Sequence, residues 1–565
     1  MTVAPAPLHE IDSPPTPAVA DPAPRWLDVA AIALGFVAFV FGALERIWLL
    51  VHVPLFSDEA VVGLMARQIN HGHFTTFFWG QQYGGVEPYL VALVTHVLPG
   101  VSGVNATAAI LSGVAAIFVG LLVTELCGDR RAGILAGSLA WTWPYTLIWN
   151  SSRELGFHFA TLALGMVMLY FAVRLAHGHR GIPTTVVLGL AAGAGWWSSP
   201  EIVYFAVPAA IVLIGSWSKW SSIRTVVLVL ASAVVGALPW LWTNARDGFK
   251  SLSRSAAPVA VPASYGERLS VFFHKTLPID LGVKTLFTGE WVGGPTLGKM
   301  LFAAALVVIV GALVASVWLF ATTRRGFTTL ACAAGVVAFP FVLAANPGTA
   351  YWIDGRYGVD LTFLIIPAVF AAYATLVLGE RRRPAGHHAA ARASQSAPIW
   401  VVALGAVALV AGVGLTAIGS HDTLGTPDTS VSAFFSGWHN PNTPITQVAD
   451  AMDAAHIHDA YGDYWTAYTL DELDPSLSVT PTRFDVVRSK ALSAAVAHSS
   501  QPAWLFFSPN ELTQAKAAFQ NPEAGPGVYD ESTFLALLAR QGIPARVVHL
   551  GILDAVIPDR APNLG

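Results

Sequence analysis

The sequence predicts a polytopic α-helical membrane protein with a small soluble α/β domain at its C-terminus. Of its 565 residues, 54% are hydrophobic and 12% are charged, and the mean hydropathy is +0.57. Soluble domains have about a quarter of their residues charged, so this composition excludes a wholly soluble protein. Apolar stretches long enough to cross a bilayer recur from residue 26 to residue 420, and the chain becomes more polar from 421 to 565.

About eleven segments have the length and apolar character of transmembrane helices, at roughly 20 residues per crossing. They lie near residues 27–50, 105–127, 133–149, 156–176, 182–198, 201–217, 225–243, 300–320, 327–345, 358–378 and 398–418. A further apolar piece at 86–99 is shorter and contains Glu87, two prolines and His96. Its length favours a helix in the plane of the membrane surface.

Basic residues then predict the orientation. With the 86–99 piece outside the membrane and the N-terminus inside, the cytoplasmic loops are 129–131, 177–180, 219–224, 324–325 and 380–392, all of which contain Lys or Arg. This distribution follows the positive-inside rule. The large external loop 244–299 is also basic, but long loops follow the rule less closely. The N-terminus is therefore expected in the cytoplasm and the C-terminal domain outside.

Several classes of protein are excluded or disfavoured. Residues 1–25 are rich in Pro and Ala without an apolar core, which predicts a disordered cytoplasmic leader and not a cleavable signal sequence. A net charge of −4 with no basic patch excludes nucleic acid as a partner. Cys127 and Cys332 fall in or beside apolar spans and form no disulfide framework. Without a P-loop or a zinc-spaced cluster, nucleotide-driven transport is unsupported.

The first external loop, 51–104, contains the most informative acidic residues. Asp58 and Glu59 open a segment whose apolar residues fall close to one helical face, which predicts a helix lying on the membrane surface. An aromatic and Gly-rich turn then leads to Glu87 and a second amphipathic helix. Two such juxtamembrane helices would roof a cavity at the bilayer surface. The alternative for the aromatic residues is an interfacial anchoring belt.

Two hinges between later spans are expected on the same external side. Arg153 and Glu154 follow a Trp-rich helix end, either as a neutralised ion pair or as part of a site. Trp197 and Glu201 flank the hinge of the segment GWWSSPEIVYF, where aromatic and hydroxyl groups would suit a sugar. An interfacial belt also accounts for tryptophan here, but a carboxylate at membrane depth is costly and points to function.

The last external motif is YWIDGRYGVDL, which places Asp354, Arg356 and Tyr357 at the start of the tenth span. Arg presents a planar fork of donors that suits phosphate oxygens. Glu45 and Arg46 lie inside the first span, where they form either a self-neutralising pair or part of the same cavity.

The order of these motifs resembles the GT-C superfamily of membrane glycosyltransferases, in its protein mannosyltransferase and ArnT-like branch. The matching segments are FSDEAVVGLMARQINHG, YGGVEPYL, SSRELGFHF, the WWSSPE hinge and DGRYGVDL. The resemblance covers the membrane region to about residue 380. It implies a GT-C fold, a polyprenyl-phosphate sugar as donor and inversion at the anomeric carbon. The implied reaction requires no cofactor. The external acids could bind a divalent cation, and no metal ligands are assigned.

The resemblance also implies roles for individual residues. Asp58 falls where the family has its essential acid, which deprotonates or orients the acceptor, and Glu59 would share this role. Glu154 corresponds to a second-loop acid that lines the sugar site, and Arg356 matches a late Arg-Tyr pair that holds the donor phosphate. Glu87 stands before Pro88-Tyr89, where the family often has Lys-Pro-Pro. The missing Lys puts phosphate binding by this loop in doubt, and a family Lys is also absent from the hinge at 197–200.

Residues 421–565 are expected to form a separate external domain. PAWLFFSP and ARVVHLGILDAVIP are typical of strands, and NELTQAKAAFQ and ESTFLALLARQG of helices. Their alternation predicts a small α/β domain over the active-site face. The aromatic run at 461–468 is either a surface that contacts sugar or a strand edge within the core.

The sequence thus predicts a glycosyltransferase of the bacterial plasma membrane that transfers a sugar from polyprenyl phosphate to a glycan, lipid or protein acceptor. The catalytic residues would be Asp58 and Glu59, and the substrate-binding residues Glu87, Arg153, Glu154, Trp197, Glu201, Arg356 and Tyr357. A lipid transporter or flippase and a catalytically inactive GT-C scaffold are the alternatives. A transporter would place its ionisable residues near the membrane midplane, whereas these acids gather at one surface.

Overall fold

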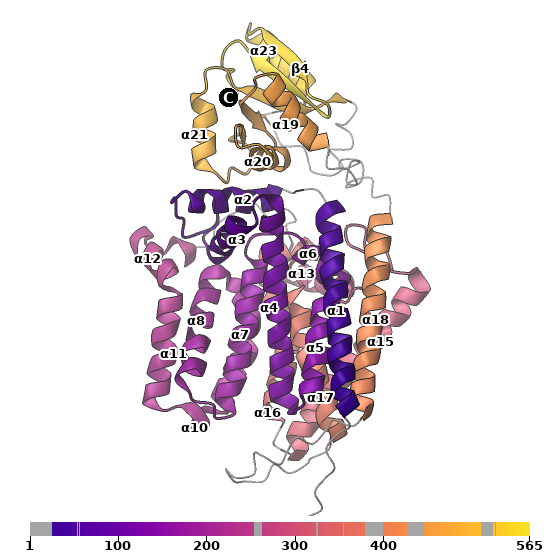
Figure 1. Cartoon of the computed structure of the whole chain (residues 1–565). Helices are drawn as coiled ribbons and strands as arrows, with labels where there is room; N and C mark the ends of the chain where they lie inside the picture. Colours follow the sequence, from indigo (N-terminus) through magenta and orange to yellow (C-terminus); the bar gives the residue numbers. More distant parts are fainter. Residues whose placement is uncertain are drawn as a thin grey trace, which may run out of the picture.

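The computed structural model describes residues 25–52, 55, 57–252, 263–323, 326–353, 355–378, 399–425, 444–509, 524–525 and 527–565. It consists of a bundle of long helices and a small α/β domain that lies over one end of the bundle (Figure 1). The predicted leader, the loop at 380–392, Asp354 and the predicted helix NELTQAKAAFQ fall outside the described residues.

Each predicted span contains helix. The helices of the bundle are α1 (Arg25–His52), α4 (Val101–Cys127), α5 (Arg130–Thr142), α6 (Tyr145–Ser151), α7 (His158–Ala176), α8 (Ile182–Ser198), α9 (Val203–Gly215), α11 (Ile223–Gly236), α15 (Pro295–Thr323), α16 (Phe327–Leu343), α17 (Asp360–Leu378) and α18 (Ile399–Gly425). Shorter segments connect them: η1 (Pro200–Ile202), α10 (Trp217–Trp220), α12 (Leu238–Asp247), η2 (Lys250–Leu252), α13 (Tyr265–Val271), η3 (Phe272–Thr276), α14 (Leu277–Asp280) and η4 (Pro347–Ala350).

Not all of these helices are long enough to cross a membrane alone. Among the described residues, five have the required length and hydropathy, namely α1, α4, α7, α15 and α18. The pair α11 and α12 qualifies as one span only when joined, and it is bent by 63°. The shorter apolar helices α9, α16 and α17 lie in the same bundle (Figure 1).

The predicted span at 133–149 is divided, because α5 ends at Thr142 and α6 begins at Tyr145. Pro144 lies in the break, where its missing N–H cannot continue the hydrogen-bond ladder. The start of α5 is also set locally, since the Asp129 side chain accepts from the backbone N–H groups of Arg131 and Ala132. As a result α6 turns toward the end of the bundle that holds the predicted site.

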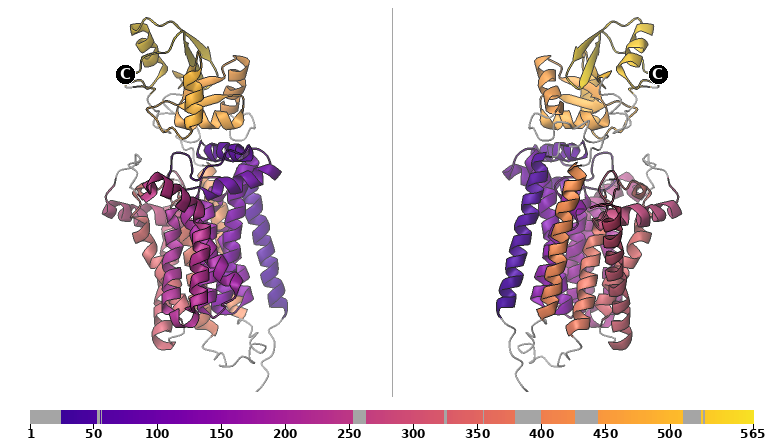
Figure 2. Two further views of the ribbon diagram at one scale, coloured as in Figure 1. Left: turned by 90° about the vertical axis from the view of Figure 1, so that its left-hand side faces the viewer. Right: turned by 90° about the vertical axis from the view of Figure 1, so that its right-hand side faces the viewer.

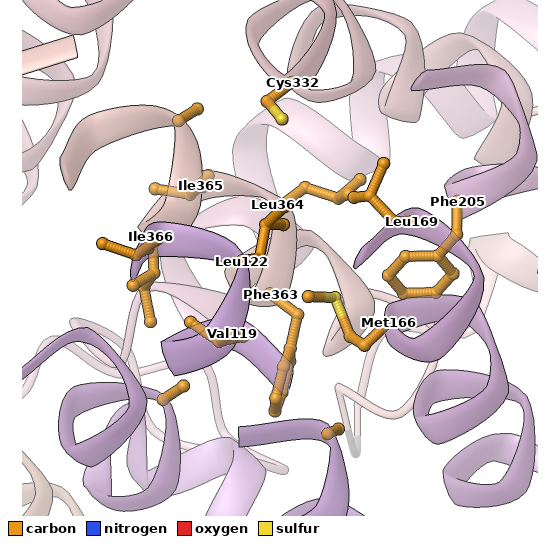
Figure 3. Packing of buried hydrophobic residues seen from close by; sticks show 14 of the residues in the cluster. Val119, Leu122, Met166, Leu169, Phe205, Cys332, Phe363, Leu364, Ile365 and Ile366 are labelled. Atoms are coloured by element: carbon orange, nitrogen blue, oxygen red, sulfur yellow. The ribbon is translucent and has the colours of Figure 1, made fainter. Parts of the chain in front are cut away.

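Large aliphatic and aromatic side chains fill the centre of the bundle (Figure 3). Met166 and Leu169 of α7 belong to this core together with Phe205 of α9 and Phe363 of α17. The close approach of α7 and α9 depends on Gly165, because a Cβ there would lie 2.2 Å from the ring of Phe205. The apolar packing fixes α7 and α17, which follow the segments that contain Glu154 and the pair Arg356 and Tyr357.

Two short helices lie at the end of the bundle beneath the α/β domain, α2 (Ser57–Asn70) and α3 (Val86–Val97). Figure 2 shows α2 across the bundle end and not along it. At 1.5 Å per residue, α3 extends about 18 Å, too short for a hydrocarbon core of about 30 Å. The predicted juxtamembrane helices are therefore present.

The α/β domain contains a five-stranded sheet in the order β2-β1-β3-β5-β4. Its strands are β1 (Asp459–Gly462), β2 (Ser478–Pro481), β3 (Ala503–Phe507), β4 (Ala545–His549) and β5 (Leu553–Pro558), and its helices are α19 (Pro444–Ala454), α20 (Tyr464–Leu473), α21 (Lys490–His498) and α23 (Glu531–Arg540). The two segments predicted as strands are confirmed, since PAWLFFSP contains β3 and ARVVHLGILDAVIP contains both β4 and β5, and the predicted helix ESTFLALLARQG contains α23. Figure 1 shows α20 on the side that faces α2.

Candidate active site

Asp58 and Glu59 are both in the first turn of α2, where carboxylates are favoured by the helix dipole. Consecutive residues of a helix point about 100° apart, so the two side chains enter different surroundings. Asp58 reaches toward α17 and the α/β domain, whereas Glu59 is buried toward α4 and the loop after α6.

The Asp58 carboxylate contacts residues from two distant parts of the chain. Its Oδ2 accepts a hydrogen bond from Nη1 of Arg356 at 2.9 Å, and its Oδ1 accepts one from the hydroxyl of Tyr464 at 2.5 Å. Burial on its own raises the pKa of Asp58, but Arg356, Tyr464 and Arg488 outweigh it and hold this pKa below its ordinary value. The side chains of Asp58 and Arg356 remain 20% and 17% exposed, so the pair is not fully enclosed.

Glu59, in contrast to Asp58, forms a fully buried ion pair. Its Oε1 lies 2.6 Å from Nε of Arg153, its Oε2 accepts from Asn105 at 3.1 Å, and its side chain is 1% exposed. The sequence allowed Arg153 to pair with its neighbour Glu154, but the structure pairs it with Glu59. The backbone N–H of Glu154 instead donates to Asn105, which connects α2, α4 and the loop after α6.

Glu87 and Glu154 meet inside the protein, and both side chains are fully buried. Glu87 Oε2 accepts from the N–H of Ala160 in the first turn of α7, and Glu154 Oε1 accepts from the N–H of Gly156. Burial raises the pKa of Glu87 to about 7, and burial and the charge of Glu87 raise the pKa of Glu154 well above its usual value. Protonation of either carboxyl group allows a hydrogen bond between them.

The remaining predicted residues line the same end of the bundle. Glu201 Oε2 lies 3.0 Å from Nδ1 of His158, and the His158 ring meets that of Tyr357 edge to face at 5.6 Å between centroids. Trp197 donates from Nε1 to the carbonyl oxygen of Thr76 at 2.7 Å, which ties α8 to the first loop. The structure brings Arg356 beside Asp58 and Tyr357 beside Arg356 and His158. It keeps Glu59, Glu87, Arg153 and Glu154 buried.

Arg46 is separate from this site and is held by polar groups around it. It donates to Ser151, Ser112 and the backbone oxygens of Gly42 and Trp141, and its guanidinium lies 3.7 Å from the Trp141 ring centroid. These contacts give it a structural role in joining α1, α4 and α5. The self-neutralising pair with Glu45 is not among the ion pairs formed by the described residues.

Two residues at the site were not predicted to act there, and both come from the α/β domain. Tyr464 belongs to the aromatic run at 461–468, which is divided between β1 and α20. The composition of this run indicated a candidate sugar contact, but it did not predict the hydrogen bond between Tyr464 and Asp58. Arg488 lies just before α21, in a stretch without any distinguishing pattern. No group of three or more His, Cys, Asp or Glu within the described ranges is arranged to hold a metal ion.

Comparison of the structure with solved structures identifies the fold. The chain resembles ArnT from Cupriavidus metallidurans, crystallised bound to undecaprenyl phosphate and in the apo state, with a TM-score of 0.55 and 14% identity over 95% of this chain and 99% of that chain. The archaeal oligosaccharyltransferase AglB from Archaeoglobus fulgidus, in complex with an inhibitory peptide and a dolichol-phosphate, gives a TM-score of 0.44 and 15% identity over 94% and 74% of the two chains.

At the level of sequence, no protein-family model matches the chain. No curated protein matches it either. The structural likeness shows the fold, and the chain is a polytopic membrane protein with the GT-C fold of membrane glycosyltransferases. Its particular reaction has to be argued from its own site.

Proposed function

We propose that the protein is an inverting glycosyltransferase that moves a sugar from a polyprenyl-phosphate donor to a glycan, lipid or protein acceptor. The observation that carries the proposal is the contact between Asp58 and Arg356, an ionised carboxylate and a guanidinium in a partly open site at one end of the bundle. A base for the acceptor and a cation for the donor phosphate are the two groups that this reaction needs. The ArnT-like fold supports a polyprenyl-phosphate lipid as donor.

In the proposed reaction, the acceptor hydroxyl oxygen attacks the anomeric carbon of the sugar from the side opposite the phosphate. A new C–O bond forms, the bond between that carbon and the phosphate oxygen breaks, and its electron pair leaves with polyprenyl phosphate. Asp58 takes the proton of the acceptor, and Arg356 stabilises the charge that develops on the leaving phosphate. The proposed chemistry uses no metal cofactor.

The buried charged residues position the elements of this site and do not contact the substrate. Glu59 and Arg153 fix the first turn of α2, and Glu87 and Glu154 join α3 to the start of α7. We assign to these four residues a positioning role, and to Trp197, Glu201 and Tyr357 a place in the wall of the substrate cavity. We place the site at the external face of a bacterial plasma membrane, with the N-terminus in the cytoplasm, because the described basic loops at 129–131, 177–180 and 219–224 lie at the opposite end of the bundle (Figure 1).

The test is donor turnover by the purified protein in lipid vesicles with labelled polyprenyl-phosphate sugars. Asp58→Asn keeps the size of the side chain but cannot accept a proton, so we expect turnover to fall by about 10²–10⁴-fold. Asp453→Asn, an exposed site on α19, is the matched control and should equal wild type. Equal turnover by Asp58→Asn and wild type would refute the assignment, and movement of lipid across the vesicle without donor consumption would indicate a flippase.

A further inference from the structure

Arg488 reaches the active-site end of the bundle from the α/β domain. Its guanidinium carbon lies 5.7 Å from the ring centroid of Tyr464 and 5.7 Å from that of Phe78, which belongs to the first loop of the bundle. The side chain also passes over Gly80, where a Cβ would lie 3.4 Å from Nη1 of Arg488. Arg488 therefore occupies the boundary between the α/β domain and the bundle.

The position of Arg488 places a second positive charge near Asp58. Asp58 and Tyr464 raise the pKa of Arg488 although burial lowers it, and Arg488 in turn helps to lower the pKa of Asp58. Arg488 and Arg356 both act to lower the pKa of Tyr83, which burial raises. Nε of Arg488 is buried and makes no hydrogen bond within the part of the chain that the structure describes.

The charge of the reacting groups explains why one arginine would be insufficient. A polyprenyl-phosphate sugar is a phosphodiester with one negative charge, and cleavage of its sugar bond converts it to a monoester with up to two. Arg356 is already paired with Asp58 in the resting site. Among Asp58, Arg356 and Arg488, the second guanidinium leaves one positive charge in excess for the donor phosphate. It would stabilise the leaving group, which carries more negative charge, more strongly than the donor.

We infer that Arg488 binds the donor phosphate together with Arg356, so that the α/β domain completes the active site of the membrane domain. This inference rests on the proposed function, since it names the lipid phosphate as the ligand. The planar fork of Arg488 provides several N–H donors to phosphate oxygens. Phe78 and Tyr464 hold the guanidinium in place through their rings.

The first measurement compares donor turnover by Arg488→Gln, Arg488→Lys and the control Arg483→Gln. Arg483 lies in the same loop but is exposed. We expect a fall of about 10²-fold for Arg488→Gln, partial recovery in Arg488→Lys and no change in Arg483→Gln. Turnover by Arg488→Gln within twofold of Arg483→Gln would overturn the inference while leaving the catalytic role of Asp58 intact.

The second measurement is binding of undecaprenyl phosphate, which does not require turnover. Arg488→Gln should bind this lipid about tenfold more weakly than Arg483→Gln, whereas undecaprenol, which lacks the phosphate, should bind both variants equally. Equal binding of undecaprenyl phosphate by the two variants overturns the inference. Weaker binding by Arg488→Gln in a protein that consumes no donor supports the phosphate site and rejects only the proposed transferase activity.

A third measurement needs no variant and guards against misfolding of Arg488→Gln. Phenylglyoxal modifies accessible guanidinium groups, and mass spectrometry of the wild-type protein quantifies the modification at each arginine. Undecaprenyl phosphate should protect Arg488 and leave Arg483 reactive. Equal modification of Arg488 with and without the lipid contradicts the inference.

Discussion

Asp58 and Glu59 follow each other in α2, yet only the carboxylate of Asp58 is partly exposed. Asp58 lies at the boundary with the α/β domain and is partly exposed, whereas Glu59 is enclosed with Arg153 and Asn105. The sequence identified both acids, because charges beside an apolar span stand out. It could not separate their roles, since their different environments come from residues between 46 and 406 positions away.

At the residue scale, the buried pair of Glu87 and Glu154 should make stability depend on pH. The pKa of Glu87 rises from 4.5 to about 7 on folding, so the folded protein holds more protons than the unfolded chain in this window. The contribution to stability is thus complete below pH 4.5 and is lost as the pH rises through 7. The full shift corresponds to about 3 kcal/mol. We expect the thermal midpoint in detergent to fall between pH 5 and pH 8.

The variant that checks this prediction is Glu87→Gln. The amide does not titrate, keeps an oxygen for the N–H of Ala160 and donates to Glu154, so its thermal midpoint should vary less with pH. Glu290→Gln, at an exposed position, should retain the wild-type slope. An unchanged slope in Glu87→Gln would show that other groups cause the pH dependence.

At the element scale, the start of α3 packs closely against the end of α8 and against the loop that precedes α3. Gly85 precedes α3, and Trp197 at the end of α8 donates to the carbonyl of Thr76 beside it. A Cβ on Gly85 would lie 1.9 Å from the oxygen of Thr76 and 2.4 Å from Nε1 of Trp197. Only a glycine at position 85 therefore leaves room for the hydrogen bond between Trp197 and Thr76.

Gly85→Ala should destabilise the protein, because the added methyl group forces Thr76 and Trp197 apart. Overpacking of this kind costs about 1–3 kcal/mol. Gly266→Ala in α13 is the control, since a Cβ there meets no atom within 4 Å and Ala favours helix. The measurement is the thermal midpoint of the two variants in detergent. A midpoint for Gly85→Ala equal to that of Gly266→Ala would show that the loop moves without cost.

At the scale of the whole molecule, the α/β domain is joined to the bundle through α2 and α20. Val61 and Met65 of α2 share a buried cluster with Tyr464 and Tyr468 of the α/β domain. Arg67 adds hydrogen bonds to the backbone oxygens of Asp471 and Glu472 and an ion pair to the Glu472 carboxylate at 2.8 Å. This contact places Tyr464 and Arg488 at the site.

Arg67→Ala should loosen the docking of the α/β domain, because Glu472 is left 5% exposed without its cation. Hydrogen bonds to charged groups contribute about 1.5–3 kcal/mol, and the partial exposure of Arg67 reduces this value. We expect hydrogen exchange in α20 to become about tenfold faster, measured by mass spectrometry of the intact protein. Arg540→Ala, on the exposed face of α23, should leave α20 unchanged. Equal exchange in both variants would mean that the apolar cluster alone holds the domain.

The sequence by itself determined the membrane class, the places of the helices in the bundle, and β3, β4, β5 and α23 of the α/β domain, because apolar length and periodicity are local properties. Its motifs also indicated the GT-C fold, which the likeness to ArnT confirms. It did not show the ion pair of Glu59 with Arg153 or the contacts of Tyr464 and Arg488. These contacts join residues far apart in the chain, and those of Tyr464 and Arg488 form only once the α/β domain is packed on α2. The tertiary structure therefore decided which of the two adjacent acids stays partly exposed and which is enclosed in an ion pair.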